Sequence, residues 1–245
     1  MQTDLTGKRA LVTGASRGVG AALADVLAGR GVDLALGYRD KRARAEMVAQ
    51  RVEGLGRRAV LVQADITVPD EVARMFRETE AALGGLDLLV LNASGGLEKN
   101  KAPDYAVRLN KGAQLDLLTR ALPLMPGGSR VIFVTSHLAH FYGQAPSLPG
   151  YERVAESKRA GENALRALIP ELGARGISLV VVSGDLIEGT ITPKLLERSS
   201  PGLIEARREQ TGGLPTTEEF AAAIADAAGD AGLGSGDTVF VGSVT

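Results

Sequence analysis

The stretch VTGASRGVGAALA, residues 12–24, decides the fold of this 245-residue chain. It joins a short apolar run to an alanine-rich segment and places glycines at positions 14, 18 and 20. Glycine lets the backbone turn sharply and approach a ligand closely, and the start of a helix offers unpaired N–H groups and a positive dipole end. The stretch therefore predicts a strand, a tight turn and a helix whose N-terminus holds the pyrophosphate of a nucleotide.

Short apolar runs alternate with longer Ala/Leu/Arg/Glu segments along the rest of the chain. Most of the runs are continuously apolar, which is typical of strands buried on both faces of a parallel sheet. The runs cover residues 9–14, 32–38, 58–65, 86–93, 130–136, 177–184 and 238–243. The helical segments cover roughly 18–30, 41–54, 69–84, 103–125, 150–174 and 216–230. This alternation predicts a single doubly wound α/β domain over residues 1–245, with about seven mainly parallel strands and helices on both faces.

Residues 185–215 interrupt this regularity. They contain Pro193, Pro201, Pro215 and the pair Gly212–Gly213. We expect a short helical excursion over one end of the sheet, with the role of a lid or substrate loop that long insertions in compact domains often have.

The composition excludes several kinds of site and partner. The chain has no cysteine and only two histidines, so thiolate metal sites and cysteine nucleophiles are excluded and a histidine-rich metal site is not expected. The formal net charge is −1, so no overall positive field would attract nucleic acid or anionic lipid. No apolar stretch approaches the roughly 20 residues of a membrane span. We expect a cytoplasmic protein that acts on a small molecule, without metal, nucleic acid or membrane.

Further motifs make the chain resemble the short-chain dehydrogenase/reductase family over nearly its whole length. The glycine turn has the family's T-G-x-x-x-G-x-G spacing, "DIT" follows the third run, and "LNASGG" follows the fourth, with Ser94 intruding in the family's N-A-G turn. The resemblance implies a Rossmann-type fold and a nicotinamide dinucleotide. The cofactor-binding residues that it implies are Thr13, Gly14, Ser16, Arg17, Gly18, Val19, Gly20, Arg39, Asp65, Ile66, Asn92, Ala93, Ser94, Lys158, Gly184 and Thr190.

The end of the second predicted strand bears on which nicotinamide cofactor binds. A site that prefers NAD usually has a carboxylate there, whereas a site for NADP has cations that bind the 2′-phosphate. This strand ends at Tyr38 and is followed by Arg39, and Arg17 lies inside the glycine turn. Two guanidinium groups that converge on a phosphate favour NADP. Asp40, next to Arg39, weakens this inference, so NAD stays open as the alternative.

The resemblance also implies the residues of a chemical step. Ser136 stands where the family's serine holds the substrate carbonyl, and Lys158 where a lysine binds the nicotinamide ribose and activates a tyrosine. Asn110 stands where an asparagine positions a water in a proton relay. The family's tyrosine lies four residues before the lysine, but here Val154 occupies that position. The usual proton donor is therefore missing, and a tyrosine introduced at position 154 is expected to restore it if nothing else in the pocket has changed.

Tyr151 is the nearest substitute along the chain. It lies seven residues before Lys158, which is about two helical turns and roughly the same helical face. In a continuous helix it would lie about 4.5 Å further toward the N-terminus than residue 154, and helical side chains lean in that direction too. We therefore expect a poor geometric replacement. Tyr142, His137 and His140 are alternative donors, since imidazole suits proton transfer near neutral pH.

Three functions fit these observations. The first is an NADP-dependent carbonyl reductase or alcohol dehydrogenase with a degenerate or relocated proton donor. The second is a non-redox enzyme on the same scaffold, such as a lyase, dehalogenase or cyclase. The third is a nucleotide-binding or sensing protein without catalysis. Helices at 103–125 and 150–174 resemble those that form the family's subunit interfaces, which implies a homodimer or homotetramer.

Overall fold

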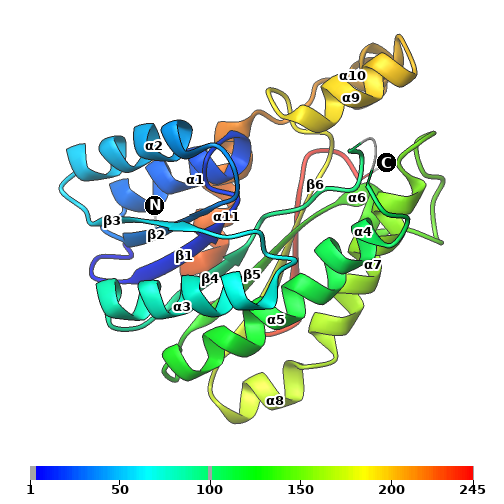
Figure 1. The fold of residues 1–245 in the computed structure, drawn as a ribbon. Helices are drawn as coiled ribbons and strands as arrows, with labels where there is room; N and C mark the ends of the chain where they lie inside the picture. The colour runs from blue at the N-terminus through cyan, green and yellow to red at the C-terminus, as the bar shows by residue number, and fades with distance from the viewer. Residues whose placement is uncertain (1–3, 99–100, 245) are drawn as a thin grey trace.

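A computed structural model describes residues 4–98 and 101–244, and within them seven strands form one parallel sheet (Figure 1). The strand order is β3-β2-β1-β4-β5-β6-β7, and each of the six pairings is parallel. The strands are β1 (Arg9–Thr13), β2 (Asp33–Tyr38), β3 (Ala59–Gln63), β4 (Leu88–Leu91), β5 (Arg130–Ser136), β6 (Ser178–Gly184) and β7 (Thr238–Val241). The predicted doubly wound Rossmann-type sheet is confirmed.

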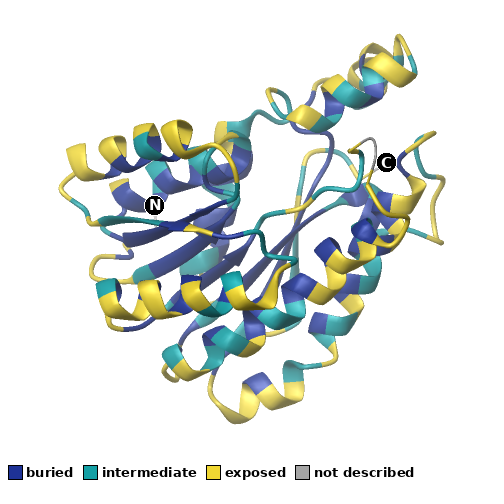
Figure 2. Ribbon diagram, in the orientation of Figure 1, coloured by how far each residue is buried: buried dark blue, intermediate teal, exposed yellow. Residues whose placement is uncertain are grey.

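Helices cover both faces of the sheet, and each face has its own apolar core. The first layer consists of α1 (Gly18–Gly29), α2 (Arg42–Gly54) and α11 (Thr217–Gly229). The second consists of α3 (Pro69–Leu83), α5 (Ala113–Ala121), α7 (Glu152–Arg166) and α8 (Ile169–Ala174). The five inner strands are almost entirely buried, which explains why their sequences are continuously apolar, whereas the edge strands β3 and β7 are partly exposed (Figure 2).

The helical segment predicted at 103–125 is broken into several pieces. It contains α4 (Tyr105–Val107), a π-helical turn (Arg108–Gly112), α5 and a short 3₁₀ turn (Leu122–Leu124). A Cβ at Gly161 would overlap the carbonyl oxygen of Asn110, so glycine at that position lets α7 lie directly against the π-helical turn. The predicted helix 150–174 likewise divides into α7 and α8, because Pro170 lacks the N–H that would continue the first helix.

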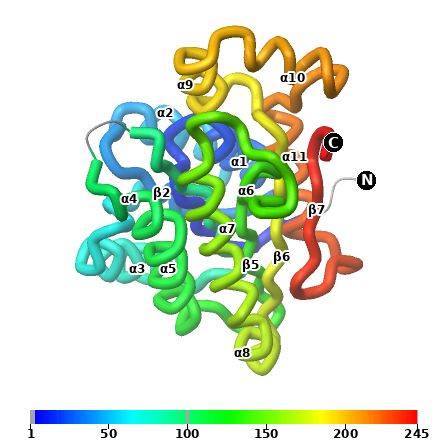
Figure 3. The backbone as a smooth tube through the Cα atoms, turned by 90° about the vertical axis from the view of Figure 1, so that its right-hand side faces the viewer, coloured from blue at the N-terminus to red at the C-terminus, as the bar shows by residue number. Residues whose placement is uncertain are grey.

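Residues 185–215 contain two helices, α9 (Ile191–Ser199) and α10 (Leu203–Thr211), which project beyond the carboxyl end of the sheet (Figure 3). Their apolar side chains pack against the chain between β5 and α7, where a short helix α6 (His137–His140) lies. We call this packing the lid cluster; its buried members are Ala139, Tyr151, Val154, Ala155, Leu186, Leu196, Ile204 and Leu214. Across the described residues, no helix has the length and apolar character needed to cross a membrane.

Candidate active site

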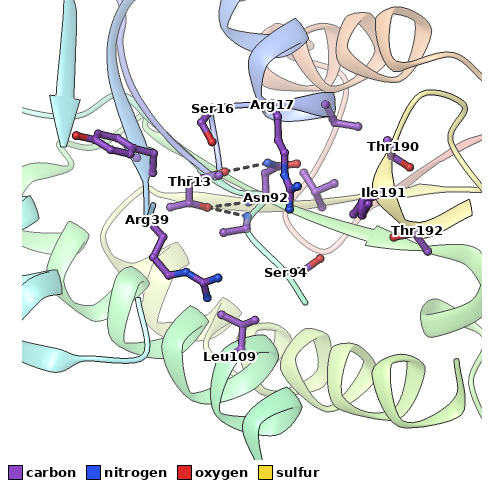
Figure 4. A pocket seen from close by; sticks show the side chains of 18 of the residues that line it. Thr13, Ser16, Arg17, Arg39, Asn92, Ser94, Leu109, Thr190, Ile191 and Thr192 are labelled. Carbon is purple, nitrogen blue, oxygen red and sulfur yellow. Dashed lines mark hydrogen bonds between the residues drawn. The ribbon is translucent and has the colours of Figure 1, made fainter. Parts of the chain in front are cut away.

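A cavity of about 580 Å³ lies at the carboxyl end of the sheet, where the strand order reverses between β1 and β4. Ligands of open α/β sheets bind at such a switch point. In Figure 4, Arg39 lies at one end of the cavity and Thr190 and Thr192 at the other, with Arg17 and Asn92 between them. The cavity therefore extends from the end of β2 to the start of α9.

The glycine turn forms one wall of this cavity. Gly14 and Gly18 have φ angles of 71° and 54°, which other residues rarely adopt. A Cβ at Gly20 would overlap the Gly14 carbonyl, so only glycine fits there as well. The helix α1 begins at Gly18, and Arg17 at its N-cap makes no side-chain capping bond. The first N–H groups of α1 are thus left for a ligand, as a pyrophosphate site requires.

Thr13 links this turn to the end of β4. Its hydroxyl donates to the Val90 carbonyl at 3.1 Å and accepts from the N–H groups of Asn92 and Ala93, each at 3.0 Å. The Asn92 amide donates to the Thr13 carbonyl at 2.9 Å (Figure 4). These bonds fix the two strand ends between which a dinucleotide would lie.

Positive side chains gather at the β2 end of the cavity. Arg39 lies there, and Lys41 and Arg44, which follow it in the chain, line the cavity too. Arg17 also lines the cavity, as the sequence predicted, but nearer its middle. Lys41 and Arg44 were not expected from the sequence, although both stand in the basic run 39–44 that follows β2. Among the described residues, Arg17, Lys41 and Arg44 form no ion pair. This end can therefore bind an anion of high charge.

Asp65 lies on the same side of the cavity and stays ionised. It accepts hydrogen bonds from the N–H and hydroxyl of Thr67 at 2.9 and 2.7 Å. Burial by itself would raise the pKa of Asp65, but the bonds from Thr67 and the nearby charges of Arg39 and Lys101 lower it below the ordinary value. The carboxylate is held as an acceptor at the cavity wall, next to Ile66, which also lines it.

Tyr151 and Ser136 meet in the other half of the cavity. Their hydroxyl oxygens are 3.2 Å apart, both residues line the cavity, and Tyr151 is only 4% exposed. The expectation of a poor fit was wrong, because it placed Tyr151 inside a continuous helix. The helix α7 begins at Glu152, and Tyr151 is its N-cap residue, whose carbonyl accepts from the Ala155 N–H at 2.9 Å. The spacing along one helix could not show that the connection after β5 brings Ser136 to the Tyr151 hydroxyl.

Lys158 lines the same cavity from within α7. It is 7% exposed, and it has neither a hydrogen bond nor an ion pair with any residue of the described ranges. A buried, unpaired ammonium group is costly unless a ligand or a water provides acceptors. Its position therefore fits a ligand hydroxyl or a phenolate as partner.

Val154 does not line this cavity. It is 4% exposed and packs against the turn that follows β4. A Cβ at Gly96 would lie 3.0 Å from Cγ2 of Val154 and 2.9 Å from Cβ of Ala106, so no space is left between these three residues. The position that carries the family's tyrosine has become a packing position.

Asn110 and Gly184 do not line the cavity. Asn110 is 1% exposed, and its amide donates to the Gly95 carbonyl at 2.8 Å and to Oγ of Ser157 at 2.9 Å. Gly184 packs against the ring of Phe220. Every other cofactor or catalytic residue expected from the sequence lines the cavity, including Ser16, Val19, Ser94 and Thr190.

The three alternative proton donors are also absent from the cavity wall among the described residues. Nδ1 of His137 is 2.8 Å from Oγ of Ser183, and burial lowers the pKa of this histidine. The His140 ring lies 2.9 Å from the fully buried carboxylate of Glu162. Tyr142 packs against the lid cluster. Of the four candidate proton donors, Tyr151 is therefore the one that lies next to Ser136.

Comparison with known proteins agrees with this geometry. Residues 8–199 match the family model described as short chain dehydrogenase. The chain is 31% identical to hydroxynaphthalene reductase arp2 of Aspergillus fumigatus over 206 residues, which covers 81% of this chain and 73% of that protein. It is 33% identical to versicolorin reductase 1 of Aspergillus parasiticus over 190 residues, covering 75% and 71% of the two chains.

Solved structures give the same result over almost the full length. A short chain dehydrogenase from Burkholderia cenocepacia in complex with NADP superimposes with a TM-score of 0.85 and is 31% identical. The match covers 97% of each of the two chains. A blue fluorescent protein from a metagenomic library in complex with NADPH has a TM-score of 0.83, with the same identity and the same coverage. This chain belongs to the short-chain dehydrogenase/reductase family and is an oxidoreductase of the short-chain type.

Proposed function

We propose that the protein is an NADP-dependent carbonyl reductase in which Tyr151 is the relocated proton donor. The observation that carries this proposal is the 3.2 Å contact between the Tyr151 and Ser136 hydroxyls, in a cavity that Lys158 also lines. The cations at the β2 end favour NADP over NAD, and the NADP and NADPH complexes among similar structures support the same cofactor. The reductases among its relatives support the direction of the reaction.

The reduced nicotinamide supplies the hydride when it is bound. Ser136 donates a hydrogen bond to the carbonyl oxygen of the substrate and holds it beside Tyr151. The phenol of Tyr151 gives its proton to that oxygen as negative charge develops on it, and the ammonium group of Lys158 stabilises the phenolate that remains. Lys158 also binds ribose hydroxyls, which gives its unpaired charge a partner. Asn110 does not line the cavity; it holds Gly95 and Ser157 in place through its side-chain amide.

We also propose that residues 185–215 form a lid over the substrate. This segment lines the cavity with the aliphatic residues Leu186, Ile187 and Ile191 and with polar ones, Asp185, Thr190, Thr192 and Lys194. Leu196 and Ile204 pack in the lid cluster together with Tyr151. The lid therefore shares an apolar cluster with the proposed proton donor, and the mixed wall fits a ketone that has both apolar and polar parts.

The decisive experiment compares Tyr151→Phe with the wild-type enzyme in an NADPH oxidation assay with activated ketones. Loss of a general acid is expected to lower kcat by about 10²–10⁴-fold. The Kd for NADPH should stay unchanged, because the ring and its packing are kept. Tyr142→Phe is the matched control, since that phenol lies outside the cavity wall, and it should keep full activity. Unchanged kcat in Tyr151→Phe would overturn the proposed donor. Substrate conversion without nicotinamide oxidation would instead indicate a non-redox enzyme.

A further inference from the structure

Arg39 is held by two bonds of its guanidinium and one of its backbone carbonyl. Its Nε donates to Oδ2 of Asp40 at 2.8 Å, and its Nη1 donates to the hydroxyl of Tyr105 at 2.8 Å. The side-chain amide of Gln63 donates to the Arg39 carbonyl, also at 2.8 Å. Within residues 4–98 and 101–244, Nη2 has no partner. The guanidinium is therefore fixed in direction with one nitrogen left to bind a ligand.

Tyr105 reaches Arg39 from a different part of the fold. It is the first residue of α4, it lies 66 positions further along the chain, and it is 4% exposed. Burial raises the pKa of Tyr105 despite the nearby charge of Arg39, so the phenol stays neutral at physiological pH. A neutral acceptor orients a guanidinium without cancelling its charge. The other partner, Asp40, is 59% exposed and offsets little of that charge through water.

Lys41 and Arg44 line the cavity beside Arg39 and have no ion pair among the described residues, and Arg17 lines the middle of the cavity. Three carboxylates, Asp40, Asp65 and Glu98, line the cavity too, and each already accepts a hydrogen bond from a protein group. The hydroxyl of Ser16 lines it as well. A 2′-phosphate would supply acceptors for Nη2 of Arg39 and for the unpaired cations, whereas the 2′-hydroxyl of NAD would not carry the charge to do so.

We infer that Tyr105 is a positioning residue that sets the direction of Arg39 and thereby part of the preference for NADPH over NADH. This inference rests on the proposed function, because it takes NADP as the cofactor. A guanidinium that is already oriented loses less conformational entropy when it binds phosphate, so removal of the phenol oxygen should weaken binding of 2′-phosphorylated ligands only. Tyr105 itself does not line the cavity, so it acts through Arg39.

Two adenosine fragments test the inference without the nicotinamide end. Adenosine 2′,5′-bisphosphate carries the 2′-phosphate and 5′-AMP lacks it, and calorimetry on the full chain measures both Kd values. Tyr105→Phe should weaken the bisphosphate by about 5–10-fold, as expected when one long side chain must be ordered on binding, and leave 5′-AMP unchanged. Arg39→Ala should weaken the bisphosphate at least as much. The double variant should bind like Arg39→Ala alone, because the two residues act as one unit.

The matched control is Tyr142→Phe, which should change neither Kd. An unchanged or tighter Kd for the bisphosphate in Tyr105→Phe, with a clear loss in Arg39→Ala, would overturn the inference and leave the NADP proposal intact. Equal losses for both fragments in Tyr105→Phe would mean a general disturbance of the site and would overturn it too. No loss in Arg39→Ala would overturn both proposals. Thermal unfolding of each variant confirms that the proteins compared are folded.

Discussion

Asp185 and Arg207 form a two-point ion pair that joins the end of β6 to the helix α10. Nε of Arg207 is 3.2 Å from Oδ1 of Asp185, and Nη2 is 3.0 Å from Oδ2. The Asp185 side chain is 3% exposed and the Arg207 side chain is 18% exposed. Arg207 also donates to the Ser243 carbonyl at 3.4 Å. The second helix over the cavity is thus tied to the sheet and to the segment after β7 through one side chain.

Removal of Arg207 is therefore expected to destabilise the protein. Arg207→Met leaves the Asp185 carboxylate buried without its main partner, and the free energy of unfolding should fall by roughly 3 kcal/mol. Urea unfolding measures the change, and the double variant with Asp185→Asn should recover part of it. Arg208→Met is the control, because the ion pairs of Arg208 with Glu188 and Glu205 are exposed and should contribute less than about 1 kcal/mol. Similar losses in both variants would contradict a special role for Arg207.

Val154→Tyr should not restore the family's arrangement, contrary to what the sequence suggests. The position faces Gly96 and Ala106 rather than the cavity, so a phenol there must displace the turn after β4. Overpacking of this kind usually costs about 1–3 kcal/mol. We expect a lower Tm and no gain in ketone reduction over the wild-type protein. A large gain in kcat at an unchanged Tm would show that the turn moves aside freely.

Gly161→Ala should affect both stability and cofactor binding. Its Cβ would overlap the Asn110 carbonyl, so α7 must move away from the π-helical turn and carry Lys158 with it. We expect a loss of about 1–3 kcal/mol in the free energy of unfolding and a higher Kd for NADPH. Gly173→Ala is the control: that glycine has open space around it in α8, so alanine should be neutral or stabilising by up to about 1 kcal/mol. Equal stability of both variants would count against the close contact.

His137 should make the free energy of unfolding fall as the pH drops below the ordinary histidine pKa of 6.5. Burial lowers its pKa in the folded protein from the ordinary value of 6.5, so the unfolded chain takes up the proton first as the pH falls. The free energy of unfolding should therefore fall as the pH drops below 6.5, by up to about 1.4 kcal/mol per pH unit, until the folded pKa is reached. In His137→Phe this slope should be shallower between pH 6.5 and that point, as urea unfolding at several pH values will show. An identical slope would mean that other groups dominate.

The sheet and the nucleotide end were predictable because local sequence determines them. Strands buried on both faces must be continuously apolar, and a backbone turn with φ angles near those of Gly14 and Gly18 requires glycine. Both requirements are visible in a short window of residues. The basic run after β2 could also have identified Lys41 and Arg44, had every cation in it been counted.

The half of the cavity that holds Ser136, Tyr151 and Lys158 was harder to predict. Its geometry depends on where helices begin and on which residues, distant in the sequence, come together. The contact between Tyr151 and Ser136 depends on how the connection between β5 and α7 folds back, and the helical repeat around Lys158 says nothing of that. The π-helical turn at Asn110 has no signature in the apolar pattern. The Arg39–Tyr105 bond joins two segments that no local window contains.

The place of Tyr151 at the very start of α7 has a consequence for redesign of the enzyme. In an arrangement with the donor inside the helix, its distance from Lys158 is set by the helical repeat and cannot be adjusted. Here Tyr151 is anchored to α7 as well, because its carbonyl accepts from the Ala155 N–H at 2.9 Å, but its ring packs with Leu186 and Leu196 in the lid cluster. Substitutions at these two leucines would therefore change the direction of the phenol while Lys158 keeps its place in the helix. With Tyr151 as the proposed donor, the chain offers a scaffold in which the substrate pocket is reshaped from the segment 185–215 without any change in α7.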